Sequence, residues 1–542
     1  MVGNISKQKR DVLVTKIGQI RTFVSAAPQD ENTGNLLTYL SDLEKEVKSK
    51  KYGLVFEEHR ETVDELLDTH IPVLTEDKDL FIDNGGQINF LIEGDNLAAL
   101  KLLLKTHRGK VDVVYIDPPY NRGKRDFVYD DNYVDALDTF KHSKWLSFQK
   151  ARLSIAKELM SKGSLIFISI DDNEVAQLKM LCDDIFSPDN FINMFIWQRN
   201  SSGKTEKDKF TVNTEYVLLY ARNKPYILEP AYKPLAVSSR KLYKHDDQDG
   251  RGRYQTVSLQ KPRDPGPETT YDYIDENGKV WKCPAKGWRM TYEKVKALEM
   301  DNRLVLSGNT LRVKDYWNER ENEGKRIDTL WNDLSENNVG TTELEAAVGK
   351  TGAFDNPKPT DLIMRCLQIG KKDGIVLDFF VGSGTTGQAV LKQNALDGGR
   401  RRFILCTNNE NNICRDVTYE RIKGVIDRDN YQTSLKYYRI NYIPISERVY
   451  YEYADELLKH IRELIELENG INFTGNAEVA IILTDEELEA FLANASEYEK
   501  CCRLYRGHDI LLSAQQEAKL QERAITICVV PDYYYRELED GQ

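Results

Sequence analysis

The sequence predicts an α/β protein whose core is a doubly wound, largely parallel sheet, and three observations support this fold class. Strand-like apolar segments alternate with helical segments over residues 85–222, and the alternation returns over 358–428. The segment 111–116 (VDVVYI) is largely apolar, as strands covered on both faces are. Neither block alone has many strands. Together these features favour one parallel sheet that an insertion divides in the sequence.

The first element, residues 1–84, is predicted to be a helical arm. Its segment 36–47 (LLTYLSDLEKEV) carries apolar residues at helical spacing. The pattern fits a solvated helical hairpin that caps the next domain, and it fits a dimerisation arm equally well.

Residues 85–222 are predicted to form the first part of the sheet, and residues 223–350 an inserted domain. Strands of the first part are expected at 88–96, 111–116, 164–170 and 215–221. The insertion lacks regular alternation, and its start is basic, with ten Lys and Arg against four Asp and Glu in 222–263. These basic residues include Arg240, Lys241, Lys244, Arg251 and Arg253. A local basic patch of this kind is suited to phosphate groups.

Residues 351–438 are predicted to complete the sheet, with strands at 374–380 and 401–409. Residues 439–542 are predicted to form a separate, small α/β domain. Strand-like and helical segments alternate there, but no chemical motif is recognisable.

Composition limits the class of protein. The chain has 542 residues and a net charge of −12, so a nucleic-acid partner would have to be met by a local basic patch. No apolar run approaches the length of about 20 residues that spans a bilayer, and no export signal is visible. The eight cysteines form no CxxC pair, which predicts reduced thiols in the cytoplasm and no metal site.

A glycine loop, LDFFVGSGTTG (377–387), follows one predicted strand and opens a helix. Its glycines match the G-x-G-x-x-G fingerprint of dinucleotide-binding turns, and Glu410 follows about 20 residues later. However, Asp378 at the strand end would repel a pyrophosphate and suits a ligand with a cationic end. Thr385 and Thr386 could bond a carboxylate with their hydroxyls. The loop therefore favours S-adenosylmethionine over NAD.

A second motif, DPPY (117–120), ends the strand VDVVYI. Proline fixes φ and has no N–H, so the Asp117 carboxylate and the Pro118 carbonyl can both be held outward as acceptors. Two adjacent acceptors match the two hydrogens of an exocyclic amine. Tyr120 offers a flat face on which a base could stack. The motif, completed by Pro119, is thus suited to binding an aromatic amine, although it could also be a structural strand terminator.

DPPY followed by DFFVGSGTT resembles the amino-methyltransferases that act on DNA, in the motif order of their β class. The nearest resemblance is to the modification (Mod) subunits of type III restriction–modification systems. IEGDNLAALKLL (92–103), NPKPTDLI (356–363) and FILCTNNE (403–410) resemble further elements of that family. The resemblance implies a Rossmann-like methyltransferase sheet, with the insertion as target-recognition domain. It also places Phe127 and Tyr129 in an active-site loop.

Site residues follow from the motifs and this resemblance. The catalytic residues would be Asp117, Pro118, Pro119 and Tyr120. The cofactor-binding residues would be Asp95, Asn96, Lys358, Pro359, Asp378, Phe380, Gly382, Ser383, Gly384, Thr385, Thr386 and Glu410.

The implied activity is transfer of a methyl group from S-adenosylmethionine to adenine N6 in duplex DNA. The adenine would have to be flipped out of the duplex, because its amine is paired there. The implied role is the modification component of a restriction–modification or related host-defence system. Expected partners are double-stranded DNA, a second copy in a homodimer, and a restriction subunit that carries helicase and nuclease activity, with no membrane.

Three alternatives remain open at this point. The enzyme could methylate RNA adenine or cytosine N4. The glycine fingerprint could belong to an NAD-dependent oxidoreductase, in which DPPY has no role. The chain could also be a non-catalytic subunit that reads DNA, although such a subunit has no need of an intact Asp-Pro-Pro-Tyr.

Overall fold

The computed structural model describes most of the chain. The described residues are 5–26, 31–48, 56–122, 140–202, 208, 210–233, 237–261, 266–308, 310–445, 457, 459–474, 476–494, 499–507 and 510–530.

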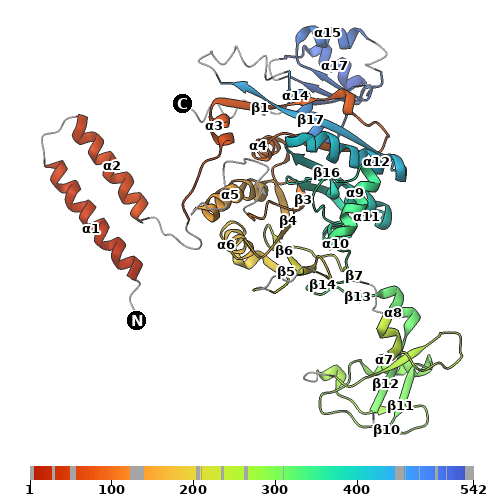
Figure 1. The fold of residues 1–542 in the computed structure, drawn as a ribbon. Helices are drawn as coiled ribbons and strands as arrows, with labels where there is room; N and C mark the ends of the chain where they lie inside the picture. Colours follow the sequence, from red (N-terminus) through yellow and green to blue (C-terminus); the bar gives the residue numbers. More distant parts are fainter. Residues whose placement is uncertain are drawn as a thin grey trace.

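The N-terminal arm is a helical hairpin. Helices α1 (Ile5–Ser25) and α2 (Glu31–Lys48) lie side by side and apart from the rest of the chain (Figure 1). A short helix, α3 (Thr62–Thr69), leads into strand β1 (His70–Glu76). The boundary predicted at residue 84 is therefore wrong, because β1 joins the central sheet by pairing antiparallel with β17.

Within the described residues, the central sheet has ten strands in the order β1-β17-β2-β16-β15-β3-β4-β6-β5-β14. The strands after β1 are β17 (Thr433–Pro444), β2 (Gln87–Glu93), β16 (Arg400–Thr407), β15 (Asp373–Asp378), β3 (Val111–Ile116), β4 (Met160–Ile170), β6 (Thr214–Ala221), β5 (Phe191–Gln198) and β14 (Leu330–Trp331). The strands from β17 to β4 are parallel, and β1 and β6 are antiparallel to their neighbours. The predicted α/β class is confirmed.

Helices cover both faces of this sheet (Figure 1). One face carries α4 (Asn96–His107), α5 (Lys141–Leu159) and α6 (Val175–Phe186), and the other carries α10 (Thr360–Ile369), α11 (Thr385–Asp397) and α12 (Glu420–Asp429). Strand β3 contributes to both cores, because successive side chains point to opposite faces. Val114 and Ile116 pack in the first core, and Val113 and Tyr115 in the second.

The sheet is split in sequence by the insertion, as expected, and its two blocks do not simply lie side by side. Strand β2, from the first block, lies between β17 and β16 of the second block. The strands that precede DPPY and the glycine loop, β3 and β15, are direct neighbours. The two blocks therefore interlock in a single sheet.

The inserted unit is attached through a two-stranded stem of β7 (Tyr232–Lys233) and β13 (Lys325–Arg326) (Figure 1). It contains η3 (Val237–Leu242), β8 (Tyr254–Ser258), β9 (Tyr273–Ile274), β10 (Val280–Trp281), α7 (Tyr292–Met300), β11 (Leu304–Ser307), β12 (Thr310–Tyr316) and α8 (Trp317–Glu323). Its small core includes Trp281 and Trp288. These two side chains are therefore packed in the core and are not available to stack on a nucleic-acid base.

The end predicted for the insertion at residue 350 is wrong. Strand β14 pairs with β5 of the central sheet, and α9 (Asn337–Val348) packs against α12. Both elements therefore belong with the sheet.

The C-terminal unit is a three-stranded parallel sheet of β18 (Val479–Ile482), β19 (Arg503–Arg506) and β20 (Thr526–Val529) with helices α15 (Asp485–Ala493) and α17 (Ala514–Glu522). It begins later than residue 439, because β17 is a strand of the central sheet and α14 (Ile461–Asn469) packs against α4 and β1. No helix among the described residues is long and apolar enough to cross a membrane.

Candidate active site

The two motif-bearing turns follow neighbouring strands. Val113 and Val114 of β3 pair in parallel register with Val376 and Leu377 of β15. Both strands therefore end at the same edge of the sheet, β3 in DPPY and β15 in the glycine loop. The carboxyl ends of parallel strands are where open α/β sheets bind ligands.

The glycine loop makes a tight turn from β15 into α11. Gly382 and Gly384 have φ values of +51° and +82°, in the left-handed region that favours glycine. A Cβ atom on Gly384 would lie 3.1 Å from the carbonyl oxygen of Thr418. The helix begins at Thr385, and its first N–H groups favour a negatively charged ligand group.

Asp378, the last residue of β15, is a buried carboxyl group. Its Oδ1 accepts a hydrogen bond of 2.9 Å from the backbone N–H of Phe380, and its Oδ2 accepts one from the Thr386 hydroxyl. Burial raises the pKa of Asp378 to about 7, because these two hydrogen bonds offset only part of the lost hydration. A ligand cation beside Asp378 would favour its ionised form.

Both oxygens of Asp117 are engaged by side chains of the site. The Tyr120 hydroxyl donates to Oδ1 at 2.7 Å, and the Lys358 ammonium lies 3.1 Å from Oδ2. Glu215, near the start of β6, has an oxygen 3.2 Å from both the Tyr120 hydroxyl and the Lys358 ammonium. The four groups form a closed ring of contacts.

Glu215 is a buried carboxylate among three cations. Its second oxygen lies 3.0 Å from Arg199 and 3.4 Å from Arg122. Burial would raise the pKa of Glu215, but the charges of Lys358, Arg199 and Arg122 outweigh burial and lower it. For Lys358, burial favours the neutral amine, but Asp117 and Glu215 outweigh it and raise the pKa. The buried pair is therefore ionised.

The Tyr120 ring is not an open stacking surface. It is only 6% exposed, and the Arg122 guanidinium and the Lys358 ammonium each lie 4.9 Å from its centroid. A base that stacked on Tyr120 would have to share the ring with these cations or displace one of them.

A cavity at this sheet edge brings together nine of the predicted site residues. They are Asp117, Pro119, Lys358, Asp378, Phe380, Gly382, Ser383, Thr385 and Thr386. Pro118, Tyr120, Pro359 and Gly384 adjoin them in the chain. Tyr115, Phe354 and Asn356 line the same cavity and were not predicted. Two turns that are distant in sequence thus share one cleft.

Three further predicted cofactor contacts neither line the described cavity nor adjoin a lining residue in the chain. Asp95 caps α4, accepting hydrogen bonds from the N–H groups of Leu97 and Ala98 at 2.7 and 3.2 Å. Asn96 is buried and donates to the carbonyl oxygen of Phe379 at 2.9 Å. Glu410 lies beyond Thr407 and Asn408, which line the cavity at the end of β16. Cofactor contact by these three residues stays a prediction.

Comparison with known proteins identifies the family. The family model described as DNA methylase (N6_N4_Mtase) matches residues 111–418, which is more than half of the chain and includes both turns. The chain belongs to this DNA methylase family.

Relatives of this chain include named methyltransferases. The type III restriction-modification enzyme StyLTI Mod subunit of Salmonella typhimurium is 33% identical over 376 residues, covering 63% of this chain and 56% of that protein. The type II methyltransferase M.KpnI of Klebsiella pneumoniae is 32% identical over 364 residues, covering 62% of this chain and 86% of its own. The EcoPI Mod subunit of Escherichia phage P1 is 31% identical, with 58% of its length covered. The chain thus spans little more than half the length of the Mod subunits it matches.

Among solved structures, PvuII DNA methyltransferase, which is specific for cytosine N4, overlaps 65% of this chain at 11% identity and a TM-score of 0.34. A TM-score this low adds nothing to what the strand order shows about the fold.

Two buried charged residues at the site, Glu215 and Arg421, were not predicted from the sequence. Glu215 is the second residue of the mainly apolar strand β6, and Arg421 lies on the buried face of α12. A charge at a position where burial is expected was the available signal. Phe127 and Tyr129 lie outside the described residues.

Proposed function

We propose that this DNA methylase transfers a methyl group from S-adenosylmethionine to adenine N6 in duplex DNA, as the modification component of a restriction–modification system. One observation carries the proposal. Asp117 of DPPY and Asp378 of the glycine loop end neighbouring parallel strands and line one cavity. A donor held by one turn and an amine held by the other would meet there.

The residues around the glycine loop fit S-adenosylmethionine. The cofactor would bring a cationic ammonium, for which the buried Asp378 is suited, and a carboxylate, for which the Ser383 and Thr385 hydroxyls and the start of α11 are suited. When bound, it supplies an electrophilic methyl group on a sulfonium. The apolar side chains of Phe380 and Val381 line the same cavity and would exclude water.

The DPPY turn would hold the target amine. The Asp117 carboxylate and the Pro118 carbonyl would accept the two N6 hydrogens, which orients the nitrogen lone pair. Because Tyr120 and Lys358 now occupy the Asp117 oxygens, the amine would have to compete with them. No strong base is needed before transfer, since the amine proton can leave afterwards.

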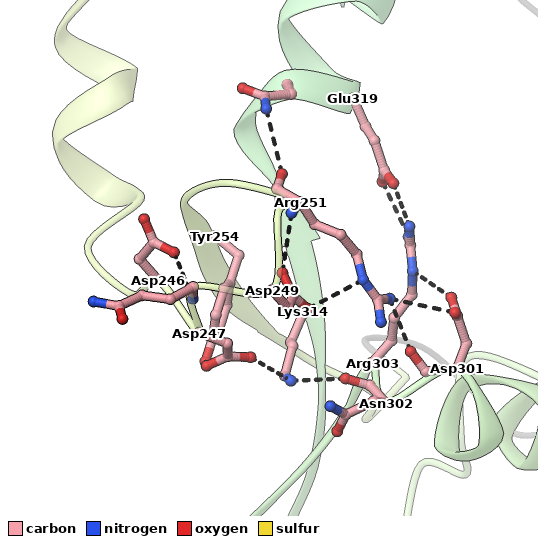
Figure 2. Close-up of polar contacts among 12 residues, drawn as sticks. Asp246, Asp247, Asp249, Arg251, Tyr254, Asp301, Asn302, Arg303, Lys314 and Glu319 are labelled. Carbon is pink, nitrogen blue, oxygen red and sulfur yellow. Dashed lines mark hydrogen bonds and ion pairs between the residues drawn. The ribbon is translucent and has the colours of Figure 1, made fainter.

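DNA recognition is assigned to the inserted unit, but not to all of its basic residues. Figure 2 shows Arg251, Arg303 and Lys314 within a network of carboxylates. Arg251 lies 3.1 Å from Asp249 and 3.3 Å from Asp301. Lys314 lies 2.6 Å from Asp247. The network also includes Arg303 with Asp301 and Glu319. These charges are balanced internally, so they hold the unit together.

Four other basic residues are suited to phosphate contacts. Arg240, Lys241, Lys244 and Arg253 are exposed, and none forms an ion pair with a described residue. They share one region around Trp317. The Arg240 guanidinium lies 5.9 Å from the centroid of the Trp317 ring, and the backbone N–H of Trp317 donates to the carbonyl oxygen of Arg253. Lys241 and Lys244 follow Arg240 closely in the chain. We assign the phosphate-binding surface of the insertion to these four residues, which we call the Trp317 patch.

The protein partners also belong to this proposal. Exposed apolar side chains on both helices of the arm favour a second copy of this chain as the partner there. They are Val12, Leu13, Ile20 and Phe23 on α1 and Leu36, Tyr39 and Leu43 on α2. Helicase and nuclease activity is assigned to a separate restriction subunit, by analogy with the named Mod subunits.

The proposal is tested with Asp117→Ala. The variant should lose methyl transfer to duplex DNA and still bind S-adenosylhomocysteine, because the cofactor loop is intact. Base-resolved sequencing of methylated DNA identifies the target. Retained transfer in the variant would refute the role of Asp117. Transfer by the wild-type chain to RNA or to cytosine N4 would replace the proposed substrate.

A further inference from the structure

Arg421 of α12 is a buried cation that has no buried counterion among the described residues. Its side chain is fully buried, and it forms no ion pair with a described residue. Its Nε donates to the Gln388 side chain at 2.8 Å, and its Nη2 is a buried donor with no hydrogen-bond partner in the described part of the chain. The charge of Glu343 raises the pKa of Arg421, but Glu343 does not pair with it and already accepts two hydrogen bonds from Thr360.

The absence of a counterion is costly. Burial lowers the pKa of Arg421 to about 10, which leaves it charged at neutral pH. Buried charges are normally paired, because an isolated charge loses its hydration without compensation. By contrast, the buried Arg401 of β16 follows this rule and pairs with Asp397 at 3.0 Å. A negatively charged ligand group could therefore supply the counterion that Arg421 lacks among the described residues.

Arg421 is linked to the cofactor cavity through two hydroxyls. Its Nη1 donates to Thr385 Oγ1 at 2.7 Å and to Ser383 Oγ at 3.1 Å. Both hydroxyls line the cavity and lie 3.1 Å apart. Because each accepts from a guanidinium, its own O–H becomes a stronger donor. One O–H is used between them at most, so at least one remains for an anion in the cavity.

We propose that Arg421 is the electrostatic anchor for the carboxylate of the cofactor's methionine moiety, acting through Ser383 and Thr385. The inference rests on the proposed function, since it requires the methionine moiety to lie at the glycine loop. It gives the two ends of that zwitterion separate partners. Asp378 attracts the ammonium, and Arg421 attracts the carboxylate.

The test compares S-adenosylmethionine with decarboxylated S-adenosylmethionine, which lacks only the carboxylate. Dissociation constants are measured by calorimetry on the full chain without DNA. In Arg421→Met, affinity for S-adenosylmethionine should fall about tenfold, the usual size of a hydrogen bond to a charged group. Affinity for the decarboxylated compound should change less than about twofold. Arg421→Lys should retain most of the preference.

Two controls separate this role from general damage. Thr385→Val keeps the arginine and removes one linking hydroxyl, so it should show the same selective loss even if Arg421→Met fails to fold. Arg401→Gln removes a buried arginine away from the hydroxyls and should leave the preference unchanged. If Arg421→Met and Thr385→Val lose affinity for both compounds equally, or lose none, the inference about Arg421 is overturned and the proposed function is unaffected. If the wild-type chain binds neither compound, the proposed function fails as well.

Discussion

At the scale of single residues, the two motif carboxylates have opposite surroundings. Asp117 lies against the Lys358 ammonium, whereas no cation among the described residues forms an ion pair with Asp378. The raised pKa of Asp378 is therefore a cost of burial that a cationic ligand would relieve. The difference also shows that an acid at the end of a strand can be read from sequence, but its charge state cannot, because the compensating Lys358 is distant in the chain.

Asp378→Asn tests this cost through stability. In the folded protein Asp378 has a pKa of about 7, above its unfolded value, so the folded state keeps a proton that the unfolded state loses. The contribution of Asp378 to wild-type stability should fall as pH rises from about 4 to about 7, by up to about 4 kcal/mol. Asparagine does not titrate, so the variant should gain stability relative to wild type over that window.

The measurement is urea unfolding of both proteins at several pH values. The missing hydrogen bonds of the variant add an offset that does not vary with pH, so only the slope of the difference counts. A difference that stayed constant between pH 4 and 8 would show that the pKa of Asp378 is not raised.

Glu215→Gln tests the ring of contacts around Asp117. Without its charge, Lys358 and Tyr120 lose a shared anchor, and Asp117 is held less firmly. We expect kcat to fall about 10- to 100-fold, as for misplaced catalytic groups, with little change in the KM for S-adenosylmethionine. A rise in KM without a fall in kcat would contradict a positioning role.

The chain offers a matched control in Glu466→Gln. Glu466 pairs with Lys436 at 2.5 Å, and both are as deeply buried as the pair of Glu215 and Lys358. It lies on α14, among residues that do not line the cavity. Glu466→Gln should lower the melting temperature without a selective loss of kcat.

At the scale of elements, helix α9 positions the segment that carries Lys358. A Cβ atom on Gly340 of α9 would lie 2.1 Å from the carbonyl oxygen of Pro357. Gly340→Ala must therefore push the helix away from residues 357–358. We expect a loss of about 1–3 kcal/mol in the free energy of unfolding, typical of overpacking, together with a lower kcat.

Gly34→Ala is the corresponding control, because Gly34 lies within α2 and a Cβ there meets nothing within 4 Å. It should be neutral or stabilising by about 0.5–1 kcal/mol. Thermal unfolding and steady-state kinetics of both variants decide the matter. If Gly340→Ala is as harmless as Gly34→Ala, α9 does not position Lys358.

The sequence predicted the individual strands better than it predicted which strands pair with one another. The strands before DPPY and the glycine loop were found from apolar runs that end in turn residues, which are local signals. The two-residue strand β14 and the edge strand β1 were missed, because they become strands only by pairing with β5 and β17. Glu215 was missed for a related reason, since its partners come from three other segments.

At the scale of the whole molecule, some basic residues are paired with carboxylates and others are not. The chain has a net charge of −12, so duplex DNA meets an unfavourable average field. Binding must depend on local cations that lack internal partners. In the inserted unit the carboxylate network occupies Arg251 and Lys314, while the Trp317 patch remains available.

This division predicts the salt dependence of DNA binding. Each phosphate that a cation neutralises releases counterions, so the slope of log K against log salt changes by about 0.9 for each such cation removed. Replacing Arg240, Lys241, Lys244 and Arg253 by alanine should flatten the slope by up to about 3.6 and weaken binding to all sequences alike.

Lys282→Ala is the matched control, because Lys282 is exposed but pairs with Asp272 at 2.7 Å, and it should leave the slope unchanged. Fluorescence anisotropy from 50 to 200 mM salt measures both slopes. If the fourfold variant keeps the wild-type slope, the duplex binds another surface, because removing a phosphate-binding cation must reduce the counterion release.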